Sequence, residues 1–150
     1  MLHALLKTIH VLGVVVWIGG MAFSQFSLRP ALAVLDGPAR VRLMQQVFQR
    51  FFAIVAVAGA LVLLTGAWMM AGVARTGVPV PPAWHAMAAL GVLMLLIFGH
   101  VRLVLYRRLA RAVQAQEWAA GAAALAGIRR WVMVNLGLGL LTIAIVLLSA

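Results

Sequence analysis

Four long apolar stretches constrain this 150-residue chain more than any other feature. They cover approximately residues 4–27, 51–72, 84–106 and 131–149. A helix of roughly 20 apolar residues crosses the hydrocarbon core of a bilayer. Hydrophobic residues make up 66% of the chain and charged residues only 9%, whereas about a quarter of a soluble domain is charged. The sequence therefore predicts one all-α domain over residues 1–150, an integral membrane bundle of four transmembrane helices.

The three connections between these stretches differ in character. Pro30 should end the first helix and a turn is expected at 36–38, after which apolar residues at helical spacing predict a helix from Ala39 into the second span. The second connection, GVARTGVPVPP, is rich in Gly and Pro and should be a loop. The third, residues 106–130, is rich in Ala and Arg and should extend the third helix before the chain turns back.

The basic residues predict how the bundle is oriented. Ten of the twelve lie in the first and third connections or at the ends of the spans beside them, and only Lys7 and Arg75 lie elsewhere. Positively charged connections stay in the cytoplasm. We therefore expect both termini and the second connection on the outer, periplasmic side of a bacterial inner membrane. The net charge of +10 is then a signal of topology, not of nucleic-acid binding.

Two absences exclude several kinds of site. The chain has no cysteine, which excludes disulfides, thiolate metal sites and iron–sulfur clusters. Its two acidic residues, Asp36 and Glu117, lie in different connections. The sequence therefore offers neither a catalytic pair of carboxylates nor a Ser-His-Asp set.

The first span carries three ionisable residues on one helical stripe, His3, Lys7 and His10. Ionisable groups are costly in hydrocarbon and indicate a functional site, so we expect the stripe to face the bundle interior. His3 and Lys7 have a simpler interpretation as residues that reach the lipid headgroups. His10 lies about 10 Å deeper than His3 and is therefore the strongest candidate ligand. The stripe continues through Trp17, Met21 and Ser24.

Further candidate ligands, together with aromatic side chains, should lie near the outer surface of the membrane. The third span begins there with Trp84 and His85. The second span ends there with Met69 and Met70, of which only one can point inward because they are adjacent. Imidazole binds copper, zinc and haem iron, and a thioether suits Cu(I). An aromatic belt and lipid-facing filler are the simpler interpretations of the tryptophan and the methionines.

The second span offers small residues, and the third span has one histidine deep in the membrane that is a further candidate ligand. The small residues leave room for close helix approach or for a cofactor. His100 lies toward the cytoplasmic side, where it is either a further ligand or a hydrogen-bonding partner of Asn135 in the fourth span. The stripe in the second span consists of Gly59, Leu63, Gly66 and Met70.

Several segments resemble a known family. KTIHVLGVVVWIGGMAF is similar to the first helix of CopD-like (copper resistance protein D) membrane proteins, in which a His is followed seven residues later by Trp-x-Gly-Gly. FFAIVAVAGALVLLTGAWMM and RRWVMVNLGLGLLTIAIV resemble the second and last helices of that group. The resemblance covers nearly the whole chain and implies copper handling in the inner membrane through the first-helix histidine. The motif residues here are His10, Trp17, Gly19 and Gly20.

The architecture also resembles that of HemJ-type protoporphyrinogen oxidases. These pair a first-helix His with a Trp-x-His-x-Lys-like start to the third helix, which implies b-type haem chemistry. Here Trp84 and His85 are followed by Met87 where Lys is expected. Asn135 is followed by Leu136, where an acidic residue often stands. The oxidase motif is therefore incomplete in this chain.

Three functional hypotheses follow. The first is a CopD-like protein that binds and handles a copper ion near the periplasmic face. The second is a b-type haem protein with two histidine ligands that oxidises a porphyrin or transfers electrons from quinol, and only this one would be an enzyme. The third is an accessory membrane subunit without a cofactor. Expected partners are the lipid bilayer, a periplasmic copper or electron-transfer protein and a second copy of the chain, but not nucleic acid.

The predicted site is shared by the first two hypotheses. Its metal or haem ligands are His10 and His85. The candidate additional ligands are His3, His100, Met69 and Met70. The residues expected to line the site are Lys7, Trp17, Gly20, Trp84 and Asn135.

Overall fold

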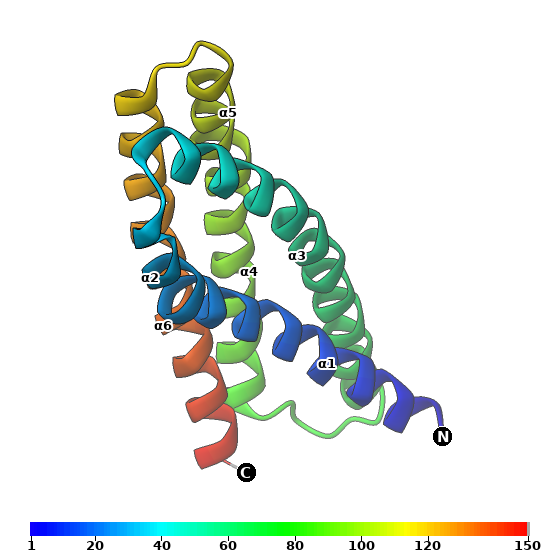
Figure 1. Ribbon diagram of the computed structural model, residues 1–150. Helices are drawn as coiled ribbons and strands as arrows, with labels where there is room; N and C mark the ends of the chain where they lie inside the picture. The colour runs from blue at the N-terminus through cyan, green and yellow to red at the C-terminus, as the bar shows by residue number, and fades with distance from the viewer. Residues whose placement is uncertain (150) are drawn as a thin grey trace.

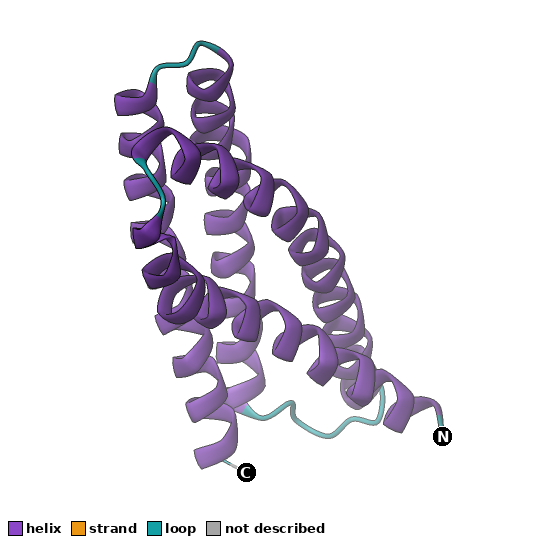
Figure 2. Cartoon of the chain, viewed as in Figure 1, coloured by secondary structure: helices purple, strands orange, loops and turns teal. Residues whose placement is uncertain are grey.

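The computed structural model describes residues 1–149, so residue 150 of the predicted domain lies outside it, and every regular element in the described part is helical (Figures 1 and 2). Consecutive helical elements join into long continuous segments, called rods below. The first rod consists of α1 (Leu2–Phe23), a π-helical turn (Ser24–Leu28), α2 (Arg29–Ala31) and a 3-10 turn (Leu32–Val34). The second is α3 (Gly37–Ala74). The third joins α4 (Pro82–His100), a π-helical turn (Val101–Leu105) and α5 (Tyr106–Gln114), and the fourth is α6 (Trp118–Leu148).

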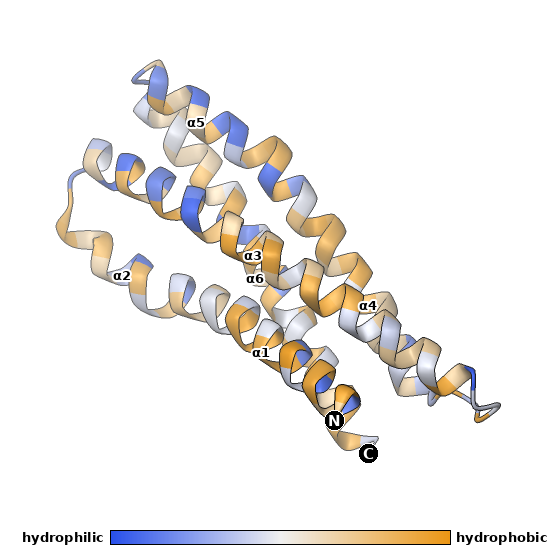
Figure 3. Cartoon of the chain, turned by 90° about the vertical axis from the view of Figure 1, so that its right-hand side faces the viewer, coloured by the Kyte–Doolittle hydropathy of each residue, from blue (hydrophilic) through white to orange (hydrophobic). Residues whose placement is uncertain are grey.

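All four rods are long and apolar enough to cross a membrane. The prediction of an all-α membrane bundle with four transmembrane helices is thus confirmed, and the chain is a multi-pass membrane protein. At 1.5 Å per residue, the 38 residues of α3 span roughly 57 Å, against about 30 Å for the hydrocarbon core. Hydrophilic residues gather in α5 and the first turns of α3, at the end away from both termini (Figure 3). Which end faces the cytoplasm remains a prediction.

Pro30 does not end the first helix, contrary to the sequence prediction. A π-helical turn directly precedes it, in which the N–H of Arg29 donates to the carbonyl of Ser24, five residues back. A proline ring normally clashes with the carbonyl four residues earlier and leaves that carbonyl without its donor. The wider π turn accommodates the ring, and the rod continues to Val34.

The other connections follow the prediction closely. The turn expected at 36–38 is the start of α3, where the Asp36 carboxylate accepts a hydrogen bond from the N–H of Ala39 at 2.7 Å. The chain between α3 and α4 is a loop in which Gly77 takes a φ of +76°, a conformation that side chains disfavour. α5 extends the third rod before the chain reverses into α6, as expected.

The rods pack as two pairs, α1 with α3 and α4 with α6, which come together through an aromatic cluster. Phe52 stacks on Phe48 with ring centroids 5.2 Å apart and meets Tyr106 edge-on at 5.6 Å. Phe98 lies edge-on to Phe52 at 5.9 Å and to Trp17 at 6.5 Å. Such edge-on and stacked contacts stabilise a core beyond their buried area. Below this cluster, toward both termini, the two pairs separate (Figure 1).

Candidate functional site

A cavity of about 450 Å³ lies where the two helix pairs separate. Its walls come from α1, α4, the second half of α3 and the second half of α6, so it lies in the half of the bundle that holds both termini. Nearly all lining atoms are apolar, and the lining residues with polar side-chain atoms are His10, Trp17 and Thr142. Ligand sites in proteins are usually concave, apolar and equipped with a few polar groups, so this cavity is the candidate functional site.

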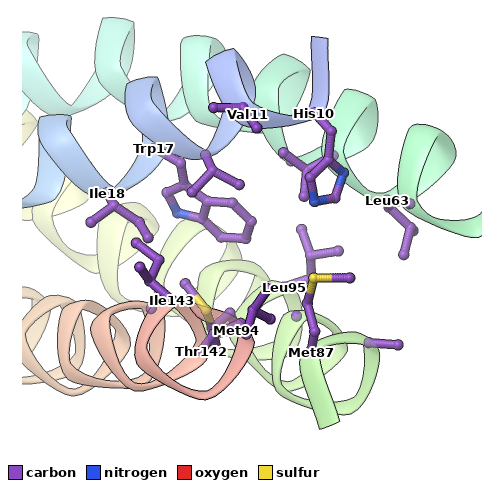
Figure 4. Close-up of a pocket in the computed structure, with 18 of the residues that line it drawn as sticks. His10, Val11, Trp17, Ile18, Leu63, Met87, Met94, Leu95, Thr142 and Ile143 are labelled. Atoms are coloured by element: carbon purple, nitrogen blue, oxygen red, sulfur yellow. The ribbon is translucent and has the colours of Figure 1, made fainter. Parts of the chain in front are cut away.

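His10 points its imidazole into this cavity (Figure 4). Its Nδ1 lies 3.1 Å from the hydroxyl oxygen of Thr65. That hydroxyl donates its own proton to the carbonyl of Leu61 at 2.6 Å, so toward the imidazole it can only accept. In the tautomer in which Nδ1 donates to this hydroxyl, Nε2 keeps a free lone pair. This is the arrangement in which a metal-binding histidine is held by a supporting hydrogen bond.

Two glycines of α3 make room for the side chains of α1. A Cβ atom on Gly66 would lie only 3.1 Å from Cε1 of His10. A Cβ atom on Gly59 would lie 2.9 Å from Leu95 and 3.5 Å from Trp17. The full stripe predicted in the second span lines the cavity: Gly59, Leu63, Gly66 and Met70.

Three thioethers line the cavity with His10. They belong to Met70, Met87 and Met94. Of the adjacent pair in α3, Met70 lines the cavity and Met69 does not, in keeping with the expectation that only one could face inward. Met87 lies across the cavity from His10, and Met94 lies deeper beside Trp17 (Figure 4). The predicted ligand set did not include Met87 and Met94, although their spacing of seven places them on one face of α4, as it does His10 and Trp17 on α1.

Several predicted site residues lie elsewhere. His85 is exposed and does not line the cavity, so the structure does not bring it together with His10. His3 and Lys7 are also exposed, which shows that the outer part of the first-helix stripe does not face the bundle interior as predicted. The reason is that the N-terminal turns of α1 lie beside the end of α3 and away from α6 (Figure 1). Trp84 is partly buried but does not line the cavity.

The remaining predicted residues lie in the half of the bundle that contains the aromatic cluster, called the closed half below. His100 is exposed and meets Trp131 edge-on, with ring centroids 5.5 Å apart. Asn135 is buried and donates from its amide to the carbonyl of Met94 at 3.4 Å, so the expected pair with His100 is not formed. Gly20 serves helix packing, because a Cβ there would lie 2.5 Å from a ring carbon of Phe51.

The donor set in the cavity is one imidazole and three thioethers. Within residues 1–149, no three His, Cys, Asp or Glu side chains come together as a metal-binding group. No second histidine lines the cavity, so the two-histidine haem site that the sequence suggested is not assembled there. One nitrogen and several soft sulfur atoms suit a soft cation such as Cu(I).

Comparison with known proteins identifies the family. The family model described as "CopD: Copper resistance protein D" matches residues 45–149, which is more than half of the chain. The match covers most of α3 and all of α4 to α6, and the residues of α1 precede it. No curated protein and no solved structure matches the chain. The resemblance seen in the sequence is thus confirmed, and the chain belongs to the copper resistance protein D family.

Proposed function

We propose that this protein takes Cu(I) as its cargo and binds it in the cavity between the helix pairs. The ligands are Nε2 of His10 and the thioethers of Met70 and Met87, one from each of three helices. The observation that carries this proposal is the His10 imidazole, held at Nδ1 by Thr65, in a cavity that also contains thioethers. Met70 lies one helical turn beyond Gly66, against which the imidazole packs.

The charge of the cavity favours a monovalent ion. No Asp, Glu, Lys or Arg side chain lines it, so no carboxylate there offsets a second positive charge. The cost of moving an ion from water into apolar surroundings grows with the square of its charge. Cu(II) also prefers nitrogen and oxygen ligands in a square arrangement, whereas thioethers select Cu(I).

Copper would enter from the end of the bundle that carries both termini. The arginine-rich opposite end faces the cytoplasm by the positive-inside rule, which puts the cavity toward the periplasm of an inner membrane. His85 is exposed two residues before Met87, and His3 is exposed near the start of α1. In this proposal they receive the ion from a periplasmic copper carrier before it passes to His10.

The test is Cu(I) binding to the purified protein in lipid nanodiscs, measured anaerobically by competition with a chromophoric Cu(I) chelator. His10→Ala and Met87→Leu should each weaken Cu(I) binding by about 100-fold. Loss of a hydrogen bond that only supports a metal ligand already lowers affinity by up to about 100-fold, and loss of the ligand itself should cost at least as much. Met133→Leu is the matched control, because Met133 is an exposed methionine of α6 outside the cavity. Equal affinity in all four proteins would refute the proposed site.

A further inference from the structure

The cavity is larger than a bound ion needs, and its wall is nearly all hydrocarbon. At about 30 Å³ for a group the size of a water molecule, its volume of about 450 Å³ holds roughly fifteen such groups. Water is a poor occupant, because a buried water needs polar partners. The hydroxyl of Thr142 already donates to the carbonyl of Leu138, and Nδ1 of His10 is paired with Thr65. Since an empty apolar space of this size costs stability, the cavity calls for a hydrocarbon occupant.

The cavity opens sideways between α1 and α6. Val11 and Val15 of α1 and Leu147 of α6 line it, yet these residues are 48%, 59% and 69% exposed. In a membrane such an opening faces the lipid chains. Deeper in the bundle the two helices meet, because a Cβ atom on Gly139 would lie 2.8 Å from Ile18. The space between them, called the α1–α6 groove below, is lined by Val11, Val15, Ile18, Gly139, Ile143 and Leu147.

Lys7 stands at the open end of this groove. It precedes Val11 by four residues, so both lie on one face of α1. Its side chain is exposed, and a lysine in such a place extends its ammonium group to the lipid headgroups. From Lys7 to Ile18 the groove runs about 16 Å along the helix, close to half of the roughly 30 Å of a hydrocarbon core. The length and the charged end therefore match one phospholipid chain from the leaflet nearest the termini.

We propose that a phospholipid places one acyl chain in the α1–α6 groove and pairs its phosphate with Lys7. The chain enters from the bilayer and ends against the indole of Trp17, which lines the same cavity (Figure 4). This inference goes beyond the proposed function. The Cu(I) ligands Met70 and Met87 lie on α3 and α4, so the lipid fills its part of the cavity with or without copper.

The first test is quenching of Trp17 fluorescence by bromine atoms on lipid chains, measured on the copper-free protein. The parent variant keeps Trp17 as its sole tryptophan, with phenylalanine in place of Trp68, Trp84, Trp118 and Trp131. It is placed in nanodiscs of phosphatidylglycerol, an anionic phospholipid, brominated midway along its chains. Trp17 is 4% exposed, so bromine reaches it only through the cavity. Its emission should fall by more than half relative to nanodiscs of the unbrominated lipid.

Filling the cavity supplies the matched controls. Gly91→Phe adds a ring on the cavity wall at a position where a Cβ would meet nothing within 4 Å. Ala88→Phe adds the same ring to that wall one helical turn away. Gly137→Phe adds it at an exposed position of α6 outside the cavity. Both cavity variants should lose the quenching, and Gly137→Phe should keep it.

The second test is the number of phospholipid molecules that stay bound to each chain in detergent, measured by native mass spectrometry. The wild type should retain one. Lys7→Gln should lower the affinity for phosphatidylglycerol about fivefold, the usual effect of one cation beside an anionic lipid. Arg75→Gln is the matched control, because Arg75 is the other basic residue at this end of the bundle but lies at the end of α3. It should leave the affinity unchanged.

Several outcomes would overturn the proposal. Equal quenching in the parent, Gly91→Phe and Ala88→Phe would mean that lipid outside the bundle reaches Trp17, and an absence of quenching in the parent would mean that no chain enters. Equal lipid affinity in Lys7→Gln and Arg75→Gln would overturn the phosphate contact. None of these results bears on Cu(I) binding, so the two proposals fail separately. Circular dichroism and gel filtration identify any variant that fails to fold, and the other cavity variant then decides.

Discussion

Replacing Thr65 by valine is the sharpest test of whether Thr65 orients His10 for the proposed binding of Cu(I). Valine keeps the shape of threonine but removes the oxygen that accepts from Nδ1 of His10 at 3.1 Å. The imidazole then loses the bond that fixes both its orientation and the nitrogen that carries the proton. Removing such a supporting bond typically lowers metal affinity about 10- to 100-fold. We expect Thr65→Val to weaken Cu(I) binding by this factor while His10 itself is unchanged.

The same substitution has a cost in stability that can be measured separately. Thr65 is 6% exposed, so its replacement by valine removes the hydroxyl partner of the His10 imidazole in a partly buried place. An unpaired buried donor costs about 1–3 kcal/mol, and the melting temperature of the copper-free protein in nanodiscs should fall accordingly. Thr65→Ser keeps the hydroxyl and should restore Cu(I) affinity to near the wild-type value.

The matched control is Thr142→Val, which makes the same chemical change in the same cavity. The hydroxyl of Thr142 donates to the carbonyl of Leu138 in its own helix at 2.8 Å and supports no candidate ligand. Its replacement should change Cu(I) affinity by less than about twofold. If Thr65→Val and Thr142→Val bind Cu(I) equally well in the chelator competition, the argument that Thr65 prepares His10 is wrong.

Five further substitutions test the cavity and the topology. Gly66→Ala places a methyl group 3.1 Å from the imidazole of His10 and should weaken Cu(I) binding. Gly72→Ala is its control, because a Cβ there would meet nothing within 4 Å. It should leave Cu(I) binding unchanged and stabilise α3 by up to about 1 kcal/mol. Gly91→Leu would project into open cavity space and should raise the melting temperature while abolishing Cu(I) binding. The chain has no cysteine, so a single cysteine placed at Gln114 or at Ser149 can report the topology. A membrane-impermeant thiol reagent added to intact cells should label the cysteine at position 149 and leave the one at position 114 unlabelled. The reverse pattern would refute the positive-inside prediction.

The fold was predictable because the bilayer imposes few solutions. Long apolar stretches must become helices, since no water is available to satisfy their backbone groups. The sequence therefore indicated the number of spans and the helical extension of α5. The sequence did not reveal the π turn before Pro30. A proline in a sequence indicates the end of a helix, whereas the switch from backbone hydrogen bonds four residues apart to bonds five residues apart depends on backbone geometry.

The site was predictable only in part, because depth can be estimated from a sequence more easily than direction. The burial cost of an imidazole singled out His10 as a candidate ligand; its side chain lines the cavity, and its role as a ligand stays a prediction. His85 lies near the depth of Met87, but two residues along a helix is a rotation of about 200°, so only one of them can face the cavity. Which face of α4 packs inward depends on α6 and α1, and the sequence does not show how those helices are placed.

The two halves of the bundle differ in the size of the side chains at the helix contacts, and this difference explains the cavity. In the closed half, Phe48, Phe52 and Phe98 fill the space between the rods. In the open half, the facing positions include Gly59, Gly66, Gly91 and Gly139. A Cβ on Gly59, Gly66 or Gly139 would meet side chains of neighbouring helices, so these glycines make room for those side chains, whereas a Cβ on Gly91 would meet nothing within 4 Å and its absence leaves open space. A cavity maintained at the expense of packing is expected where function needs the space, which is consistent with the proposed Cu(I) site beside the imidazole of α1.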